Sequence, residues 1–252
     1  MSAMIHAHRG ASAALPENTM EAFSLALAQK ADFLELDIHL TKDSEIVVAH
    51  DATLERTSDG SGYVGDRTLE ELKLLNFAHR CPERAASRIP TLAEVFDLVK
   101  PTGVSLNIEL KTTERLYPLL PAKLAALINE FKLTERVLCS SFNHYSLVAL
   151  RAHNKKVRIG LLYQLGLVDP WVYAKHLGAD AIHPHYAIIA ALPETVARCH
   201  ENGVAVNVWT VDEPSEMQAM MSLKVDGIIT NNPGTAVAVR EAFLQKNGAD
   251  ER

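Results

Sequence analysis

The amino-acid sequence predicts an α/β protein that folds as a (β/α)8 TIM barrel, with a small insertion after the second strand. Short apolar runs alternate with amphipathic helical stretches along the chain, a pattern typical of parallel strands with helical crossovers. The chain has 252 residues, a length that such barrels commonly use as one unit. A doubly wound open sheet is the alternative, but no GxGxxG motif follows the first strand.

The predicted elements follow one another in regular order. Amphipathic helices are expected at 19–30, 91–99 and 193–203, among others, and each of these stretches follows a strand or a loop. We expect the barrel strands, in chain order, at 4–8, 33–40, 104–111, 136–142, 156–163, 179–186, 205–212 and 225–231.

The segment 51–90 interrupts this order. It follows the short apolar run 45–51, has no strong strand pattern, and contains a Gly/Ser/Asp turn cluster. A capping box of Thr68 and Glu71 opens a short helix within it, and a second box, Thr91 with Glu94, restarts the regular pattern. We predict one TIM-barrel domain over 1–252, with 51–90 as an inserted subdomain at the barrel rim. Loops this long in compact domains tend to be functional.

Composition and charge exclude several classes of protein. Hydrophobic residues make up 48% and charged residues 22%, as in ordinary globular proteins, and the net charge of -6 argues against nucleic acid as the main partner. No apolar run approaches a membrane span, and no secretory signal is visible. The three cysteines, Cys81, Cys139 and Cys199, lack metal-type spacing, so we expect reduced core thiols and a cytoplasmic location.

Acidic side chains gather at the expected carboxyl ends of two strands, where barrels build their active sites. Glu35 and Asp37 are two residues apart and share a face, and Glu109 precedes Lys111 with the same spacing. Pointed inward together, three carboxylates need a cation, and Mg²⁺ or Ca²⁺ prefers such oxygen ligands over the imidazole and thiolate that suit Zn²⁺. The alternative is a buried ion network with Lys111 and Arg9, but the three carboxylates together favour one divalent metal ion.

Two histidines could exchange protons with a substrate. His8 ends the first strand, and His50 ends an apolar run directly before the insertion, so the two imidazoles could serve as general base and general acid. Arg9 could hold an anionic oxygen bidentately or form a surface salt bridge.

Other polar residues allow two interpretations. Asn18 is expected to cap the helix that begins at Thr19. Glu17 either orients a catalytic group or stabilises the helix N-terminus by its charge. Trp209 either lines a pocket or belongs to the core. His183 and His185 could be metal ligands, but loop histidines are the preferred interpretation.

A set of motifs in fixed order resembles one known family. The sequence resembles the glycerophosphodiester phosphodiesterases from His8 to about Pro233, and is most similar to the small bacterial cytoplasmic members. The motifs are HRG at 8–10, PENT at 16–19, ELDIHLTKDSEIVVAHDATLERTSDGSG at 35–62, IPTLAEV at 89–95, NIELK at 107–111, VNVWTVD at 206–212 and DGIITNNP at 226–233.

The resemblance implies a TIM barrel that cleaves a small-molecule glycerophosphodiester to sn-glycerol 3-phosphate and an alcohol such as choline, ethanolamine or glycerol. It also implies attack by the glycerol 2-hydroxyl through a cyclic phosphate. The positions that match the family's motifs carry its roles: His8 and His50 for acid/base catalysis, Arg9 and Lys111 at the phosphate, Trp209 lining the substrate channel, and Glu35, Asp37 and Glu109 as ligands of Mg²⁺ or Ca²⁺.

Two alternatives and one departure stand beside this resemblance. The pair His6 and His8 forms an HxH motif like the first ligand pair of amidohydrolase-type barrels, although those enzymes also need an Asp at the end of the last strand. A non-catalytic phosphate-ester binding barrel is the other alternative. The segment after the last strand reads TNNP, where many relatives carry Asp in place of one Asn. The preferred alcohol, the choice between Mg²⁺ and Ca²⁺, and the oligomeric state stay open.

Overall fold

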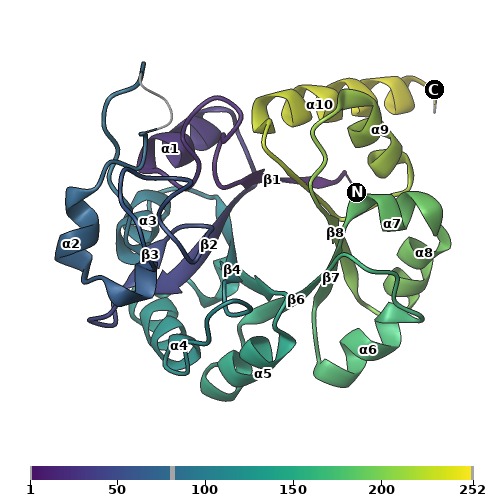
Figure 1. The fold of residues 1–252 in the computed structure, drawn as a ribbon. Helices are drawn as coiled ribbons and strands as arrows, with labels where there is room; N and C mark the ends of the chain where they lie inside the picture. Colours follow the sequence, from purple (N-terminus) through teal and green to yellow (C-terminus); the bar gives the residue numbers. More distant parts are fainter. Residues whose placement is uncertain (1, 80–82, 251–252) are drawn as a thin grey trace.

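The computed structural model describes residues 2–79 and 83–250, with only the backbone described at 247–250. Within these residues nine strands form one sheet, and eight of them are parallel and close into a barrel through the pairings of β1 with β2 and β9 (Figure 1). The predicted (β/α)8 barrel is confirmed. Its strands are β1 (Met4–His8), β2 (Phe33–Leu40), β4 (Ser105–Leu110), β5 (Val137–Ser141), β6 (Arg158–Tyr163), β7 (Ala181–Pro184), β8 (Ala205–Val208) and β9 (Gly227–Thr230).

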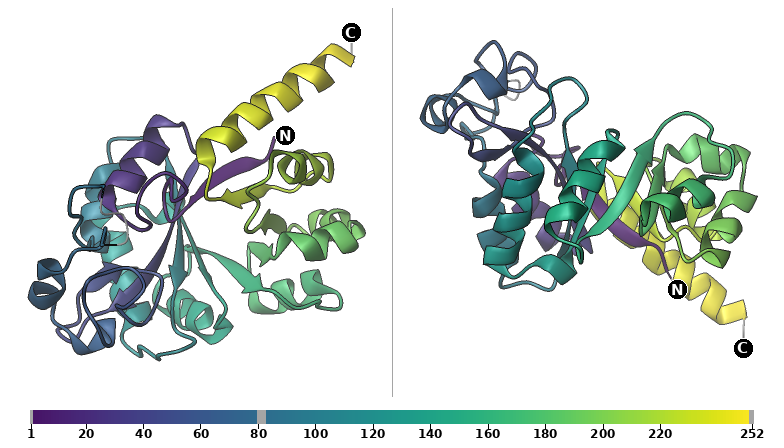
Figure 2. Two further views of the ribbon diagram at one scale, coloured as in Figure 1. Left: turned by 45° about the horizontal axis from the view of Figure 1, so that its top comes forward. Right: turned by 90° about the horizontal axis from the view of Figure 1, so that it is seen from below.

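Helices surround the barrel as an outer layer (Figure 1). Helix α3 begins after the capping box of Thr91 and Glu94, as predicted. The last helix, α10, projects beyond the barrel at its C-terminal end (Figure 2). The helices of the layer are α1 (Met20–Ala28), α3 (Leu92–Val99), α4 (Leu120–Phe131), α5 (His144–His153), α6 (Pro170–Leu177), α7 (Tyr186–Ala191), α8 (Glu194–Glu201), α9 (Pro214–Ser222) and α10 (Pro233–Asp250).

A short antiparallel strand, β3 (Ile46–Val48), follows β2 outside the ring. It returns along β2 so that Val48 lies opposite Ile38, and the N–H of Ala49 then donates to the carbonyl oxygen of Asp37 at 3.0 Å. Because this bond fixes the backbone of Ala49 beside Asp37, the next two residues, His50 and Asp51, lie beside the carboxyl end of β2.

The insertion predicted after the second strand is present, and the structure describes it except for residues 80–82. It contains the 3-10 helix η1 (Val64–Asp66) and the helix α2 (Leu69–Leu74), which begins at the predicted capping box of Thr68 and Glu71. Its apolar side chains form a small cluster of their own with β3, separate from the main core. The cluster comprises Val47, Ala49, Leu54, Val64, Leu72, Phe77 and Ile89.

The main core fills the space between the barrel and its helices. Every residue of β2 is buried, as expected of a parallel strand that is covered on both faces. Cys139 and Cys199 are buried free thiols, as predicted, whereas Cys81 lies outside the described residues. None of the helices in the described part of the chain is both long and apolar enough to cross a membrane.

Two predicted strands end at least two residues earlier than the sequence pattern indicates. Strand β7 stops at Pro184 and β8 stops at Val208, so His185 and Trp209 lie just beyond the strands and make an isolated bridge with each other. His183 is buried inside β7, and its interpretation as a loop histidine is therefore wrong.

Candidate active site

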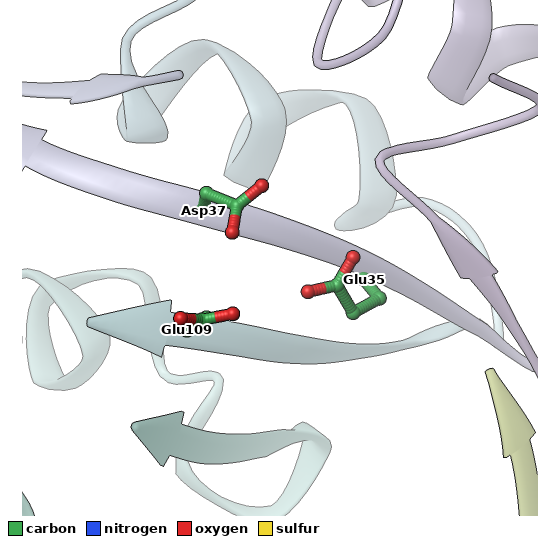
Figure 3. Close-up of side chains that lie close together, drawn as sticks. All are labelled: Glu35, Asp37 and Glu109. Atoms are coloured by element: carbon green, nitrogen blue, oxygen red, sulfur yellow. The ribbon is translucent and has the colours of Figure 1, made fainter. Parts of the chain in front are cut away.

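Three carboxylates meet at the mouth of the barrel. Glu35 and Asp37 project from β2 and Glu109 projects from β4, and one oxygen of each lies within 4.8 Å of the others (Figure 3). The parallel register pairs Asp37 with Glu109, and the two-residue pleat puts Glu35 on the same face. All three side chains are buried, so together they form a compact, anionic oxygen site.

Two cationic groups border these carboxylates. The ammonium of Lys111 donates to Glu109 Oε1 at 2.9 Å and lies 3.7 Å from Asp37 Oδ1. The Arg9 guanidinium Nε lies 3.4 Å from Asp37 Oδ2, and the Arg9 backbone N–H donates to Glu35 Oε2 at 2.9 Å. Asp37 Oδ1 nevertheless has no hydrogen-bond partner although it is buried, so the surrounding residues leave one oxygen of the cluster unsatisfied.

The close packing of like charges perturbs the acidity of the cluster. Burial, and then the charges of Asp37 and Glu109, hold the pKa of Glu35 well above its ordinary value. Burial likewise raises the pKa of Glu109 to about 7, against the opposing effect of Lys111. Burial alone would also raise the pKa of Asp37, but Lys111 and Arg9 outweigh it and lower that pKa. The ion-free cluster therefore favours uptake of protons over full ionisation.

His8 stands at the end of β1, half-buried beside the cluster. Its Nδ1 lies 2.7 Å from Asn231 Oδ1, in the loop that follows β9. Burial and the neighbouring Arg9 lower the pKa of His8 to about 4. The imidazole is therefore neutral at ordinary pH.

His50 is held on both of its ring nitrogens. Its Nδ1 lies 2.6 Å from Asp51 Oδ1, and its Nε2 lies 3.1 Å from the Lys111 ammonium. Because a carboxylate only accepts hydrogen bonds and an ammonium only donates them, Nδ1 carries the proton and Nε2 accepts from Lys111. His50 thus joins the acidic cluster through the same lysine that contacts Glu109.

A second ion network ties the insertion to the barrel. Arg56, from the inserted segment, donates to both oxygens of Glu17 at 2.7 Å and to Asp51 at 2.6 and 3.0 Å. Glu17 also accepts from Arg9 at 3.1 Å. Burial would raise the pKa of Glu17, but Arg56 and Arg9 outweigh it and lower that pKa. Glu17 therefore contacts the cluster's arginine, and Arg56 contacts both Glu17 and the carboxylate that holds His50.

Asn18 does not cap the first helix, contrary to expectation. Thr19 is the cap, because its side chain accepts from the Ala22 N–H, while Asn18 Nδ2 donates to Asp37 Oδ2 at 2.9 Å. Asn18 has a φ of 58°, a left-handed conformation that Asn tolerates better than most residues. Asn18 and Thr19 are adjacent and both residue types cap helices, so the sequence alone could not show which of them is the cap.

Among the described residues, the remaining candidate histidines and the tryptophan have contacts with partners other than the three carboxylates. His183 packs over Gly160 and accepts a hydrogen bond from Asn207 Nδ2 at 2.9 Å. His6 is buried and stacks on the Phe33 ring at 4.2 Å. Trp209 is half-buried, and its indole N–H donates to the His183 carbonyl oxygen at 2.7 Å. Neither His6 nor His183 belongs to the group of residues gathered at the acidic site.

A cavity opens beside the second ion network. It has a volume of about 370 Å³ and lies between the loop after β1 and the inserted segment. Its lining includes both charged and apolar side chains, so it suits a small molecule that carries both kinds of surface. The lining residues are Ser12, Leu15, Pro16, Glu17, Arg56, Thr57, Phe77 and Ala78.

Comparisons with known proteins agree on one family. Residues 8–235 match the model of the glycerophosphoryl diester phosphodiesterase family. The chain is 46% identical over 238 residues to a glycerophosphodiester phosphodiesterase of Caldanaerobacter subterraneus, covering 94% of this chain and 97% of that one. It is 38% identical to a glycerophosphodiester phosphodiesterase of Bacillus altitudinis, covering 94% and 98%.

Solved structures agree as well. An Oleispira antarctica phosphodiesterase, in complex with the product sn-glycerol-3-phosphate, superimposes with a TM-score of 0.85 at 27% identity, covering 95% of this chain and 97% of that one.

Proposed function

The chain belongs to the glycerophosphoryl diester phosphodiesterase family, and from this membership we propose that the site at its barrel mouth hydrolyses glycerophosphodiesters to sn-glycerol 3-phosphate and an alcohol. One observation carries the proposal: the buried carboxylates Glu35, Asp37 and Glu109 lie between two histidines and two cations at the carboxyl ends of the strands. The product complex of the Oleispira antarctica relative supports the choice of product.

The three carboxylates fit one divalent cation, Mg²⁺ or Ca²⁺. The donors are hard oxygens that lie close enough to share an ion. The buried Asp37 Oδ1 has no hydrogen-bond partner, and a bound cation would give it one. Three carboxylates outnumber the cations of Arg9 and Lys111 by one, so a divalent ion leaves one net positive charge for a phosphodiester monoanion to neutralise. When bound, the ion would supply Lewis-acid stabilisation of charge on the phosphoryl oxygens.

Arg9 and Lys111 would hold the non-bridging phosphate oxygens. Both cations already point at the carboxylate cluster, and Arg9 offers a planar donor fork suited to phosphate. Their positive charge would then offset the negative charge that builds on the phosphoryl group in the transition state.

His8 and His50 would move the protons of the reaction. One imidazole, in its neutral form, would accept the proton of the glycerol 2-hydroxyl as that oxygen bonds to phosphorus. The other, in its charged form with a second proton on Nε2, would give that proton to the departing alcohol as its P–O bond breaks. The resulting cyclic phosphate is opened by water with the two roles reversed. The neutral state of His8 fits the accepting role, and the contact of His50 with Asp51 would stabilise the charged form that the donating role needs.

The remaining residues shape the entrance. Glu17 would position Arg9, and Trp209 would line the channel through which the diester enters. The segment 51–90, taken as an inserted subdomain of a single domain that spans 1–252, would bring Arg56 to the site and form one wall of the 370 Å³ cavity that receives the alcohol. A cytoplasmic location is supported by the free thiols Cys139 and Cys199.

Both alternatives have weaker support. The amidohydrolase interpretation needs His6 as a metal ligand, but His6 is buried against Phe33 and is not among the residues gathered at the acidic site. A non-catalytic barrel would have no use for two histidines held in defined orientations beside a metal-type cluster.

The experiment that tests the proposal measures release of sn-glycerol 3-phosphate from glycerophosphocholine by the purified chain. We expect release with Mg²⁺ or Ca²⁺ and loss of release with EDTA that added metal restores. Parallel assays with glycerophosphoethanolamine and glycerophosphoglycerol identify the preferred alcohol. Absence of chelator-sensitive release from all three diesters would overturn the proposed function.

A further inference from the structure

The side-chain amide of Asn231 contacts His8 Nδ1, and a second contact fixes the orientation of that amide. Asn231 Oδ1 lies 2.7 Å from His8 Nδ1, across 223 positions of sequence. Asn231 follows β9 directly, so the closure of the barrel between β1 and β9 brings the two residues together. Ser12 adds its hydroxyl, which lies 2.8 Å from the same Asn231 Oδ1 and 2.7 Å from the His8 carbonyl oxygen.

Asp212 fixes which way the Asn231 amide points. Its Oδ2 lies 2.6 Å from Asn231 Nδ2, and its Oδ1 accepts from the Asn231 backbone N–H at 2.8 Å and from Thr230 at 3.0 Å. A carboxylate only accepts hydrogen bonds, so the amide group that faces Asp212 is the NH₂. The amide oxygen therefore faces His8, and turning the amide over would set an oxygen against a carboxylate oxygen.

This orientation dictates the tautomer of His8. An amide oxygen only accepts, so His8 Nδ1 must carry a hydrogen to occupy this position, and the lone pair of the neutral ring then lies on Nε2. We propose that Asn231, oriented by Asp212, is a positioning residue. It keeps His8 in its Nδ1-protonated tautomer and so presents Nε2 to the substrate, an inference that rests on the proposed role of His8 in proton transfer.

The arrangement resembles the one at His50 with one difference. Asp51 contacts His50 directly, whereas the charge of Asp212 reaches His8 only through a neutral amide. Both histidines are thus protonated on Nδ1, and His50 Nε2 accepts from Lys111, yet only one of the two has a carboxylate as its partner at Nδ1. Asn231 and Asp212 supply at the end of β9 the orienting contact that a single carboxylate supplies beside His50.

The tautomer can be read directly in protein labelled with ¹⁵N-histidine. At pH 8 we expect the His8 resonances, assigned by their loss in His8→Ala, to show a protonated Nδ1 and an unprotonated Nε2. The Asn231→Leu variant, which removes the acceptor, should shift His8 toward the Nε2-protonated form. Its kcat should fall about 10- to 100-fold, as when a proton-transfer group is lost in part, with KM within about 3-fold.

Two further variants separate positioning from general damage. The double variant Asp212→Asn with Asn231→Asp exchanges the amide and the carboxylate but keeps an acceptor at Nδ1, so it should restore the wild-type tautomer and most of the lost kcat. Asn232→Ala removes the neighbouring amide, which has no hydrogen bond to His8 among the described residues, and should leave tautomer and kcat unchanged.

Two results would overturn the inference. An Nε2-protonated His8 in the wild-type protein is one, and it needs no variant to fold. A loss of kcat in Asn231→Leu without any change of tautomer is another, since the role would then be structural only. The wild-type spectrum does not depend on turnover, so it tests the positioning even if no glycerophosphodiester is hydrolysed, in which case only the proposed function fails.

Discussion

His50 and Asp51 are neighbours in the chain, and their side chains are hydrogen-bonded, with His50 Nδ1 donating to Asp51 Oδ1 at 2.6 Å. Burial would raise the pKa of Asp51, but its bonds to Arg56 and His50 outweigh burial and lower that pKa to about 2. Asp51 is thus ionised at any pH at which the protein works, and it keeps the His50 proton on Nδ1.

The first prediction concerns this pair. Asp51→Asn should reduce kcat by about 10-fold or more, because an amide that turns over can donate to His50 and favour the wrong tautomer. Steady-state kinetics on glycerophosphocholine measure the effect. The matched control, Asp97→Asn, changes an exposed carboxylate on α3 and should be neutral. A kcat within about 2-fold of wild type in Asp51→Asn would show that the pair has no role in turnover.

The second prediction tests proton transfer by His8. His8→Ala should lower kcat by about 10²-fold or more, since general acid–base groups contribute this much or more, without a comparable loss of metal affinity. His153→Ala removes an exposed histidine at the end of α5 and serves as the control. Nearly full activity of His8→Ala would rule out its assignment.

The third prediction separates the proposed metal ligands from the histidines. Glu35→Gln keeps the size of the side chain but removes its charge, and should weaken Ca²⁺ or Mg²⁺ binding by about 10-fold or more in isothermal titration calorimetry. Glu45→Gln, at an exposed position in the turn before β3, should bind the ion as the wild type does. Unchanged affinity in Glu35→Gln would remove Glu35 from the ligand set.

The fourth prediction follows from the raised pKa of Glu109, which moves from 4.5 to about 7 in the ion-free protein. Between these values the native state keeps a proton that the unfolded chain has lost, so this group's contribution to ion-free stability falls as pH rises through the window. A cation must displace the same proton below about pH 7. We therefore expect tighter Ca²⁺ or Mg²⁺ binding, and a larger rise in Tm on adding the ion, at pH 8 than at pH 6.

The coupling between ion binding and loss of the Glu109 proton is measured by calorimetric titration in two buffers of different ionisation enthalpy, which gives the number of protons released. Glu109→Gln should bind the ion more weakly and with a smaller dependence on pH. Equal affinity of the wild-type protein at pH 6 and pH 8 would contradict the assignment of Glu109 as a protonated ligand.

The fifth prediction concerns the barrel interior. A Cβ on Gly160 would lie 2.3 Å from His183 Nε2, so Gly160→Ala forces a buried imidazole to move. The free energy of unfolding should fall by about 1–3 kcal/mol in urea denaturation, as in other overpacked cores. Gly103→Ala has open space around the added methyl group and should change stability by less than about 0.5 kcal/mol. Equal stability of the two variants would argue against close packing over Gly160.

Local pattern predicted the barrel and the acidic cluster, because both depend on short-range periodicity. The two-residue spacing of Glu35 and Asp37 puts both on one face of a strand whatever surrounds it, and parallel register then places Glu109 beside them. The same pattern overestimated β7 and β8, since alternation continues past the ends of both strands into His185 and Trp209, which pair only as an isolated bridge.

The contacts that orient the site could not be predicted in this way. His8 and Asn231 are 223 positions apart, and Arg56 and Glu17 are 39 apart, so their meeting depends on how loops are packed in three dimensions. Nothing in the local sequence distinguishes Arg56 from the other arginines of the insertion. Asn18 could be assigned only after the backbone showed that Thr19 already caps the helix.

The double bidentate contact of Arg56 has a consequence for the engineering and evolution of this barrel. Arg56 forms bidentate hydrogen bonds with both Glu17 and Asp51. Replacing the segment 51–90 would therefore change these contacts as well as the substrate preference. A chimera that imports a foreign segment loses Asp51 together with Arg56, so it must supply a new guanidinium for Glu17 and a new carboxylate beside His50. Diversification at this rim is therefore expected to spare Arg56 while other positions of the segment drift.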